Sequence, residues 1–313
     1  MHIPFVDLKS QYLSIQQDID GAIKEVIEQT AFIGGKHVKR FEKEFAELYG
    51  VKHVISCANG TDSLYIIMKM LGIGKGDEVI TVANSWISSS ETIGQTGAKP
   101  VFVDVHPDYL SIDDEQLEKV ITANTKALVL VHLQGQPCDL DKIEKICKAH
   151  NIHLIEDCAQ SHFSEFNGRR CGTVGIAGSF SFYPGKNLGA YGDAGCIITN
   201  DDEMAVRCRM YANHGALVKH QHEIEGINSR LDGLQAAILT AKLPYILKWT
   251  EQRISNAKLY DQYLNNIEDI KIPVVRPNSK HTYHLYVIKA GLRDELMSYL
   301  QSNGIETSIH YPT

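Results

Sequence analysis

Short apolar runs alternate with stretches whose apolar residues recur at helical spacing through the first half of the chain. Strands are predicted at HVISCA (53–58), EVITVA (78–83), PVFVDV (100–105), ALVLVHL (127–133) and HLIEDCA (153–159). Between the last two, Leu140, Ile143 and Ile146 share one face of a predicted helix. Apolar strands separated by amphipathic helices indicate an α/β fold, a mostly parallel sheet with helices on both faces.

The alternation stops after residue 170. Strands predicted at SFSFYP (179–184) and GCIITN (195–200) are joined by a glycine-rich loop without room for a crossover helix, so we expect antiparallel or irregular pairing there. Loops of this kind often carry functional residues. A long helical stretch begins at residue 229, and Pro244 within it predicts a kink or break.

The C-terminal part predicts a second, smaller unit. A strand at YHLYVI (283–288), a helix near 292–302 and a strand at IETSIHY (305–311) would form a β-α-β unit. We therefore place a large domain at residues 1–245 and a small α/β domain at residues 246–313. The sequence ends directly after the last predicted strand, so we expect the small domain to be incomplete.

Composition and charge narrow the class of protein. Of the 313 residues, 43% are hydrophobic and 22% are charged, as is ordinary for a globular protein. The net charge of −7 comes without basic blocks, which argues against a nucleic-acid partner. No apolar run is long enough to span a bilayer and the first residues lack the layout of a secretory signal, so we expect a cytoplasmic protein without a membrane partner.

The cysteines and histidines do not predict a metal site. The cysteines are Cys57, Cys138, Cys147, Cys158, Cys171, Cys196 and Cys208. They form no C-x-x-C pair, so we interpret them as reduced thiols, several of them buried in strands. The pairs His150/His153 and His281/His284 stand apart from any second cluster of ligand-type residues, so no metal is expected.

A turn suited to an anion lies between the first predicted strand and the helix that follows it. The turn is Asn59-Gly60-Thr61-Asp62. A helix N-terminus offers free amides and a positive dipole, and a glycine lets the backbone approach a phosphate closely. Taken alone, the turn favours the simpler interpretation that Asn59 or Thr61 only caps the helix.

A carboxylate is predicted where open α/β sheets bind ligands, at the C-terminal end of the strand 153–159. Glu156 and Asp157 are adjacent and point to opposite faces of that strand, so only one of them can face a site. We favour Asp157. Such a carboxylate can act as a base, bind a metal, pair with a protonated nitrogen, or form a structural ion pair.

Lys186 lies in the glycine-rich loop SFYPGKNLGAYGDAG. Most lysines are solvated surface residues, but the neighbours here are apolar or aromatic, and a lysine in a dry site becomes a nucleophile. The phosphate turn, Asp157 and Lys186 together are what pyridoxal phosphate (PLP) chemistry requires. We therefore predict that Lys186 holds PLP as a Schiff base and that Asp157 pairs with the pyridine nitrogen.

Four segments resemble those of a known family. They are VKRFEKEFAELYGVKHVISCANGTDSL, IEDCAQSHFSE, SFSFYPGKNLGAYGDAG and HGALVKHQHEIEGINSRLDGLQAAIL. The chain resembles the DegT/DnrJ/EryC1/StrS sugar aminotransferases from PFVDL at residue 4 to HYP at residue 312. The resemblance implies the aspartate aminotransferase-like fold of PLP-dependent transferases, fold type I, and a homodimer with shared active sites.

The resemblance also implies roles for individual residues. Lys186 and Asp157 would be catalytic, and Trp86 would stack on the cofactor ring, although a buried core tryptophan is a rival interpretation. Asn228 would reach the phosphate of the neighbouring subunit. The remaining implied cofactor contacts are Gly60, Thr61, Asp62, Gln160 and Ser181.

Four residues are weaker candidates for binding the substrate: His162, Arg230, His310 and Tyr311. His162 is about as easily explained as a structural histidine with satisfied hydrogen bonds. Arg230 can instead pair with Asp232 or with a helix end.

The family resemblance implies an aminotransferase that moves an amino group from glutamate to a nucleotide-linked keto sugar, for deoxyamino-sugar or surface polysaccharide synthesis such as that of O-antigen. Amination at C3 is slightly favoured over C4. One alternative is a PLP-dependent sugar dehydratase of the same family, but those members carry histidine in place of the lysine and this chain retains Lys186. The other alternative is a non-catalytic PLP-binding regulatory protein.

Overall fold

The computed structural model describes residues 2–312. Its strands are β1 (His53–Cys57), β2 (Glu78–Val82), β3 (Lys99–Val103), β4 (Thr125–Val131), β5 (His153–Asp157), β6 (Glu165–Phe166), β7 (Arg169–Arg170), β8 (Ala177–Ser181), β9 (Gly195–Thr199), β10 (Ile270–Lys271), β11 (Ser279–Lys280) and β12 (Lys289–Ala290). Its α-helices are α1 (Leu8–Ser14), α2 (Gln16–Glu28), α3 (Gly35–Tyr49), α4 (Gly60–Met70), α5 (Ser88–Thr96), α6 (Leu140–His150), α7 (Asp202–Ala212), α8 (Gly233–Lys242), α9 (Ile246–Leu264) and α10 (Arg293–Ser302). The 3-10 turns are η1 (Leu117–Val120), η2 (Leu133–Gly135) and η3 (Leu243–Tyr245).

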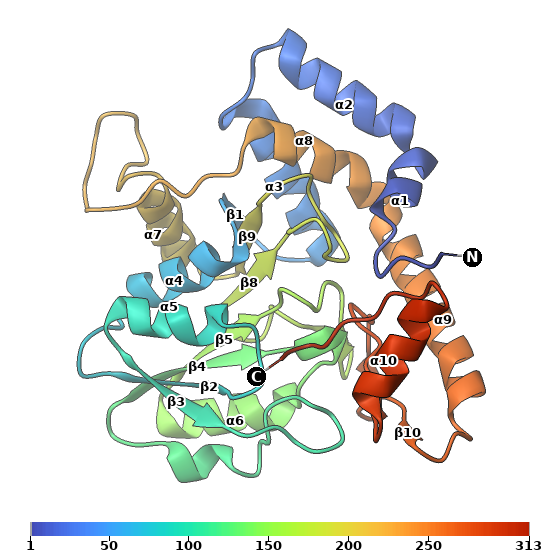
Figure 1. Ribbon diagram of the computed structural model, residues 1–313. Coiled ribbons are helices and arrows are strands. Elements are labelled where there is room, and N and C mark those ends of the chain that lie inside the picture. Colours follow the sequence, from blue (N-terminus) through green and yellow to red (C-terminus); the bar gives the residue numbers. More distant parts are fainter. Residues whose placement is uncertain (1, 313) are drawn as a thin grey trace.

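A seven-stranded sheet forms the centre of the molecule, with the strand order β1-β9-β8-β5-β4-β2-β3 (Figure 1). The strands β8, β5, β4, β2 and β3 run parallel to one another, whereas β9 is antiparallel to both β1 and β8. The predicted parallel sheet and the predicted antiparallel pairing of the two strands around the glycine-rich loop are both confirmed.

Helices cover both faces of this sheet. On one face, α4 and α7 bury a core that includes Ile66, Ile67 and Cys208. On the other face, α3, α6 and α8 bury a larger core that includes Phe41 and Leu239. The parallel strands are therefore apolar on both sides, as their continuous apolar runs predicted.

The aromatic residues of α3 show how sequence spacing builds this packing. Phe41, Phe45 and Tyr49 recur every four residues and therefore share one helix face, which is buried. Phe45 packs edge-on against Phe180 and Phe182, with ring centroids 5.7 and 5.6 Å apart. Phe180 lies in β8 and Phe182 directly follows it, so α3 supports the strand that leads into the lysine loop.

Two predictions for the C-terminal part are wrong, and two are confirmed. Residues 283–288 are not a strand, because their backbone bonds to a turn rather than to a strand: Leu285 N donates to the carbonyl of Gln134 over 3.3 Å. Residues 305–311 form only an isolated bridge, between Ile305 and Ile3. The helix α10 and the break at Pro244, which lies in η3 between α8 and α9, are as predicted.

The division into domains at residue 245 stays a prediction. The expected end of the small domain at Thr313 falls outside the described residues. Within residues 2–312, no helix combines the length and the apolar character needed to cross a membrane.

Candidate active site

The C-terminal ends of β1, β5 and β8 bring the predicted phosphate turn, Asp157 and the lysine loop to one edge of the sheet. Gly60 opens α4 directly after β1, and a Cβ built on it would lie only 2.7 Å from the Cβ of Ser181, the last residue of β8. Only glycine allows the two segments to approach this closely. The side chain of Asn59 accepts a hydrogen bond from Asp62 N over 2.7 Å and caps α4. The cap uses one amide and leaves the first amides of the helix beside the Ser181 hydroxyl, an arrangement that suits a phosphate.

Hydroxyl groups link this turn to the carboxylate site. The Oγ1 of Thr61 lies 2.7 Å from the Oγ of Ser88, and the neighbouring Ser89 donates to Asp157 Oδ2 over 3.3 Å. Ser88 and Ser89 are buried and open α5. The phosphate turn and Asp157 are therefore held at a fixed separation by the first turn of α5.

Asp157 is a buried carboxylate whose only hydrogen bonds within residues 2–312 come from neutral groups. It is 6% exposed, and besides Ser89 it accepts from the amide of Ala159 over 3.1 Å. Burial raises the pKa of Asp157, and the hydrogen bond from Ala159 and the charge of Lys186 only partly oppose this rise. A protonated ring nitrogen would supply the cationic partner that this carboxylate lacks.

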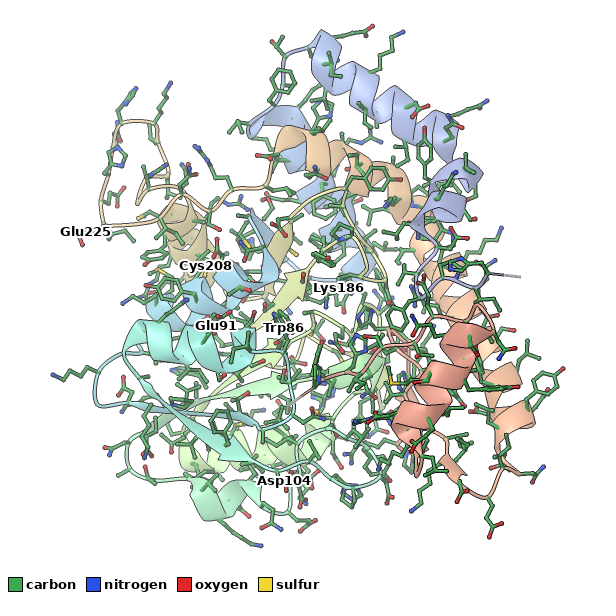
Figure 2. All side chains as sticks on the ribbon, in the orientation of Figure 1. Trp86, Glu91, Asp104, Lys186, Cys208 and Glu225 are labelled. Atoms are coloured by element: carbon green, nitrogen blue, oxygen red, sulfur yellow. The ribbon has the colours of Figure 1, made fainter. Side chains whose placement is uncertain are left out.

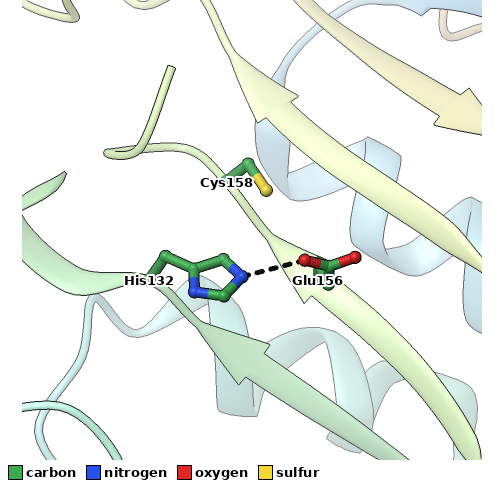
Figure 3. Close-up of side chains that lie close together, drawn as sticks. All are labelled: His132, Glu156 and Cys158. Carbon is green, nitrogen blue, oxygen red and sulfur yellow. Dashed lines mark hydrogen bonds and ion pairs between the residues drawn. The ribbon is translucent and has the colours of Figure 1, made fainter. Parts of the chain in front are cut away.

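Glu156, the neighbour of Asp157, points to the other face of β5, as predicted. Its Oε2 lies 3.0 Å from the Nε2 of His132, and both side chains are fully buried (Figure 3). Three backbone amides also donate to this carboxylate, those of Gly172, Val174 and Gly175. Burial raises the pKa of Glu156, but the hydrogen bonds from His132 and the amides outweigh it and lower that pKa.

Cys158 joins Glu156 and His132 in a cluster of three residue types that bind metals. The Glu156 carboxylate already accepts four hydrogen bonds, which use its lone pairs. We interpret the cluster as a structural anchor for the segment after β7.

Lys186 lies in a tightly folded loop. Its amide donates to the carbonyl of Tyr183 over 2.8 Å, and a Cβ built on Gly189 would lie 2.2 Å from the carbonyl oxygen of Pro184. Burial lowers the pKa of Lys186 to about 8, although the charge of Asp157 raises it. A substantial share of this amine is therefore neutral near pH 8, as a nucleophile requires.

Gln160 and Trp86 both face the C-terminal segment. The Nε2 of Gln160 donates to the hydroxyl of Tyr311 over 2.5 Å, and its Oε1 accepts from Gln134 N over 2.7 Å. Trp86 is 58% exposed, with its ring centroid 5.5 Å from that of Tyr311, so it is not a core residue. Trp86 and Lys186 both lie near the centre of the molecule in Figure 2. The indole therefore remains largely open to solvent beside Tyr311.

The weaker candidates fall in two places. His162 is fully buried, and its ring lies against Phe180 and Phe182 with centroids 5.3 and 5.7 Å apart, so its substrate role and its structural role both stay predictions. Burial and the charge of Lys186 lower its pKa to about 3. His310 is partly buried and stacks on Phe5 with centroids 5.5 Å apart.

Asn228 and Arg230 lie in the segment between α7 and α8. Asn228 forms a bridge with Asn213 at the end of α7, and its neighbour Ser229 accepts a hydrogen bond from Ala58 N over 3.1 Å, next to the phosphate turn. Asn228 and Arg230 are both exposed, and the ion pairs within residues 2–312 include none between Arg230 and Asp232. The structure thus brings together the cofactor residues but leaves Asn228 and Arg230 facing outward.

One buried residue behind the lysine loop was not predicted from the sequence. Lys242 of α8 is fully buried, donates to the carbonyl of Gly189 over 2.7 Å, and has its Nζ 4.1 Å from the ring centroid of Tyr191. The sequence could have indicated this residue, because Lys242 is the single lysine of the apolar stretch LQAAILTAKL and a charged residue in an apolar helix is rarely buried without a partner.

Comparison with known proteins decides the family. The model of the DegT/DnrJ/EryC1/StrS aminotransferase family matches residues 13–313. The chain belongs to this family. It is 43% identical to a protein of Geobacillus stearothermophilus named pleiotropic regulatory protein, over all of this chain and 84% of that protein. It is also 43% identical to dTDP-3-amino-3,6-dideoxy-alpha-D-galactopyranose transaminase of Aneurinibacillus thermoaerophilus, over 99% of this chain and 85% of the relative.

Among solved structures, that of DesV from S. venezuelae in complex with a ketimine intermediate has a TM-score of 0.97 and 40% identity, covering all of this chain and 84% of DesV. These findings confirm the predicted family, the predicted fold class and the predicted enzyme class, an aminotransferase. They also confirm PLP as the cofactor of the family. The roles of the individual residues stay predictions, and the geometry above shows that the residues present fit the cofactor.

Proposed function

We propose that this aminotransferase moves an amino group from glutamate to a nucleotide-linked keto sugar. The observation that supports the proposal most strongly is the meeting of three parts at one sheet edge: the amides of α4 beside Ser181, the buried Asp157 carboxylate, and the buried amine of Lys186. These parts match the phosphate, the ring nitrogen and the carbonyl carbon of PLP. When bound, PLP supplies an electron sink for the substrate carbon.

Each residue then has a defined task. Gly60, Thr61 and Ser181 bind the phosphate and fix the register of the ring. Asp157 keeps the ring nitrogen protonated, because a buried carboxylate strongly favours a cationic partner. Lys186 binds the cofactor while no substrate is present, and once displaced it moves a proton to and from the substrate carbon.

The keto group at C3 is the acceptor that the relatives favour. The Aneurinibacillus relative is named for a 3-amino sugar, and relatives at 40% identity are named dTDP-3-amino-3,4,6-trideoxy-alpha-D-glucose transaminase and UDP-2-acetamido-2-deoxy-3-oxo-D-glucuronate aminotransferase. These names differ in nucleotide and in sugar. The proposal therefore extends to deoxyamino-sugar synthesis and leaves the choice of nucleotide to experiment.

A regulatory, non-catalytic role is the second candidate, and the name of the Geobacillus relative favours it. The retained Lys186, whose amine is buried and partly neutral near pH 8, favours catalysis. The same lysine argues against the histidine-bearing sugar dehydratases of the family.

A homodimer in the cytoplasm is part of the proposal. Asn228 is exposed, and Leu217 and Val218, which precede it in the segment between α7 and α8, are 46% and 56% exposed. Exposed apolar residues are suited to contact with a second subunit. Asn228 would then complete the phosphate site of the neighbour.

A half-reaction screen tests the function. The pyridoxamine phosphate form of the enzyme is mixed with a panel of nucleotide-linked 3-keto and 4-keto sugars, and the return of the visible absorbance of lysine-bound cofactor is followed. We expect return with a 3-keto sugar and slower return with its 4-keto isomer. Loading by glutamate without return by any keto sugar would favour the regulatory alternative.

A further inference from the structure

The peptide group between Gly189 and Ala190 closes the lysine loop. Its amide, that of Ala190, donates to the carbonyl of Phe182 over 2.7 Å and so joins the two ends of the loop that carries Lys186. Its carbonyl, that of Gly189, accepts a hydrogen bond from the Nζ of Lys242 over 2.7 Å. Because a peptide group is planar, a bond at its carbonyl and a bond at its amide together fix the orientation of the whole group.

The next peptide group along the chain is held by a second side chain of α8. The amide of Tyr191 donates to the Oε1 of Gln235 over 2.8 Å. A Cβ built on Gly192 would lie 3.0 Å from the Nε2 of the same side chain, so this glutamine packs directly on the backbone. Gln235 and Lys242 are seven residues apart, which places them two turns apart on one face of α8. This face of the helix therefore holds two successive peptide groups of the loop.

The burial of Lys242 is offset by contacts with the loop alone. Its side chain is fully buried, and burying an amine without a hydrogen bond is unfavourable. The carbonyl of Gly189 supplies the acceptor, and the ring of Tyr191, whose centroid lies 4.1 Å from the Nζ, supplies a π face. Both partners lie in the segment 189–191, so the amine is directed at the loop rather than at solvent.

The closing segment packs against the backbone that carries Lys186. A Cβ built on Gly189 would lie 2.2 Å from the carbonyl oxygen of Pro184, two residues before the lysine. The amide of Lys186 itself donates to the carbonyl of Tyr183 over 2.8 Å. A displacement of Gly189 toward the loop therefore has to move the backbone of residues 184–186 as well.

We propose that Lys242 and Gln235 are positioning residues for Lys186. The inference rests on the proposed role of Lys186 as the cofactor-binding amine. The two side chains of α8 fix the closing segment, and the closing segment fixes the backbone from which the amine extends. The rate at which an amine attacks a carbonyl carbon depends steeply on distance and orientation. A loosely closed loop should therefore slow the capture of PLP before it weakens the fold.

The test compares variants of Lys242 in two measurements. The first is hydrogen–deuterium exchange of the apoenzyme, in which the amide of Ala190 reports the closing bond to Phe182. The second is the rate at which the apoenzyme captures PLP, followed by visible absorbance. Lys242→Met removes the donor, so we expect exchange at Ala190 to be about tenfold faster and capture to be about tenfold slower. Lys242→Arg retains a donor and should bring both rates back toward the wild-type values.

Lys248→Met is the matched control, because it makes the same substitution at an exposed lysine of α9. It should leave both rates unchanged. Gln235 provides an independent pair of variants. Gln235→Met removes the acceptor of the Tyr191 amide and should slow capture, whereas Gln235→Glu keeps a carboxylate oxygen there and should restore the rate.

Capture at the wild-type rate in Lys242→Met overturns the inference whether or not exchange is faster, because the hydrogen bond would then serve the fold alone. Slow capture accompanied by faster exchange throughout the chain also overturns it, because the change would be a general loss of stability. If Lys242→Arg does not restore the rate, equal rates in Gln235→Met and Gln235→Glu overturn the inference. Failure of the wild type to capture PLP would instead overturn the proposed function.

Discussion

At the scale of single residues, burial disfavours the charged form of Lys186 and the charged form of Asp157. One cofactor can compensate both residues. Burial lowers the pKa of the lysine to about 8 and raises the pKa of the aspartate. Each group acts on the other, but Asp157 has no hydrogen bond from a cation among residues 2–312. A ring that carries a protonated nitrogen and an electrophilic carbon satisfies both residues at once.

Replacing Lys186 with alanine should abolish the visible absorbance that appears when the protein is incubated with PLP. The variant should melt at the same or a higher temperature without cofactor, because it removes a buried amine that is costly to charge. Absorption spectra and thermal melting check both statements. Lys126→Ala, which removes an exposed lysine of β4, serves as the control and should give the wild-type spectrum. A wild-type spectrum in Lys186→Ala would refute the assignment of the lysine.

Replacing Asp157 with asparagine should leave cofactor capture intact while turnover falls by about a hundredfold or more, because an amide cannot hold the ring nitrogen protonated. The amide can still accept from Ala159, so the fold should be retained. Single-turnover rates with glutamate measure the loss. Near-normal rates would remove the electronic role of Asp157.

Lys186 and Asp157 could be predicted from the sequence because the residues next to each in the chain indicate a site. Asp157 lies at the end of a predicted strand, and Lys186 lies in a loop rich in glycine and aromatic residues. The sequence did not predict Lys242. The position of this lysine depends on contacts with residues distant in the chain, such as Gly189.

At the scale of elements, the start of α4 and the end of β8 form one unit. Gly60→Ala should weaken PLP binding by about tenfold, because the new Cβ would meet the Cβ and backbone of Ser181 and must push the two segments apart. A spectroscopic titration with PLP measures the affinity. Gly21→Ala in α2 is the control, since no atom lies within 4 Å of its new Cβ. It should raise the free energy of unfolding by roughly 0.5–1 kcal/mol. Equal PLP affinities in the two variants would contradict the close approach.

The helix α8 and the lysine loop are linked through Lys242, whose pKa burial lowers to about 8. Since the unfolded chain has an ordinary lysine pKa near 10.4, the folded state binds fewer protons between about pH 8 and 10.4, and the stability contributed by this group rises with pH across that window. Lys242→Met removes the contribution. The wild type should therefore gain stability relative to the variant as pH rises from 8 to 10, in urea unfolding measured at each pH. Curves that stay parallel would place the Lys242 pKa at its ordinary value.

The elements that the sequence predicted well are those decided by local pattern. The continuous apolar runs gave the central strands to within about two residues at most ends, as expected for such boundaries. The run 283–288 has the same apolar character, but its Leu285 amide donates to the carbonyl of Gln134, and Thr282 just before it donates to the carbonyl of Gly135. A contact between segments so far apart in the chain has no local signature, so the strand prediction failed there.

At the scale of the whole molecule, the proposed dimer makes each active site depend on two chains. A mixture of two inactive variants tests this. Lys186→Ala lacks the lysine, and Asn228→Ala lacks the residue proposed to reach the neighbour. A mixed dimer has one site in which the Asn228→Ala chain supplies Lys186 and the other chain supplies Asn228. Equal mixing after subunit exchange should restore about a quarter of the wild-type sites.

Activity of the mixture is compared with each variant alone. Asn228→Ala that is fully active alone, or a mixture no more active than its parts, would show that Asn228 does not act across the interface. Asn228 is exposed in the single chain and is therefore accessible to a second subunit.

The place of β1 in the sheet has a consequence for the making of the protein. Within the described sheet, β1 ends at Cys57 and pairs with β9 alone, which begins at Gly195. As the chain leaves the ribosome, the first strand synthesised therefore waits unpaired until the loop of Lys186 has emerged, and contacts between such distant segments form late in folding. Pairing of β1 with β9 then brings the turn at Gly60 against Ser181. The nascent chain thus acquires the two ends of the cofactor site in a single late step, and no shorter nascent chain can bind the cofactor at both ends.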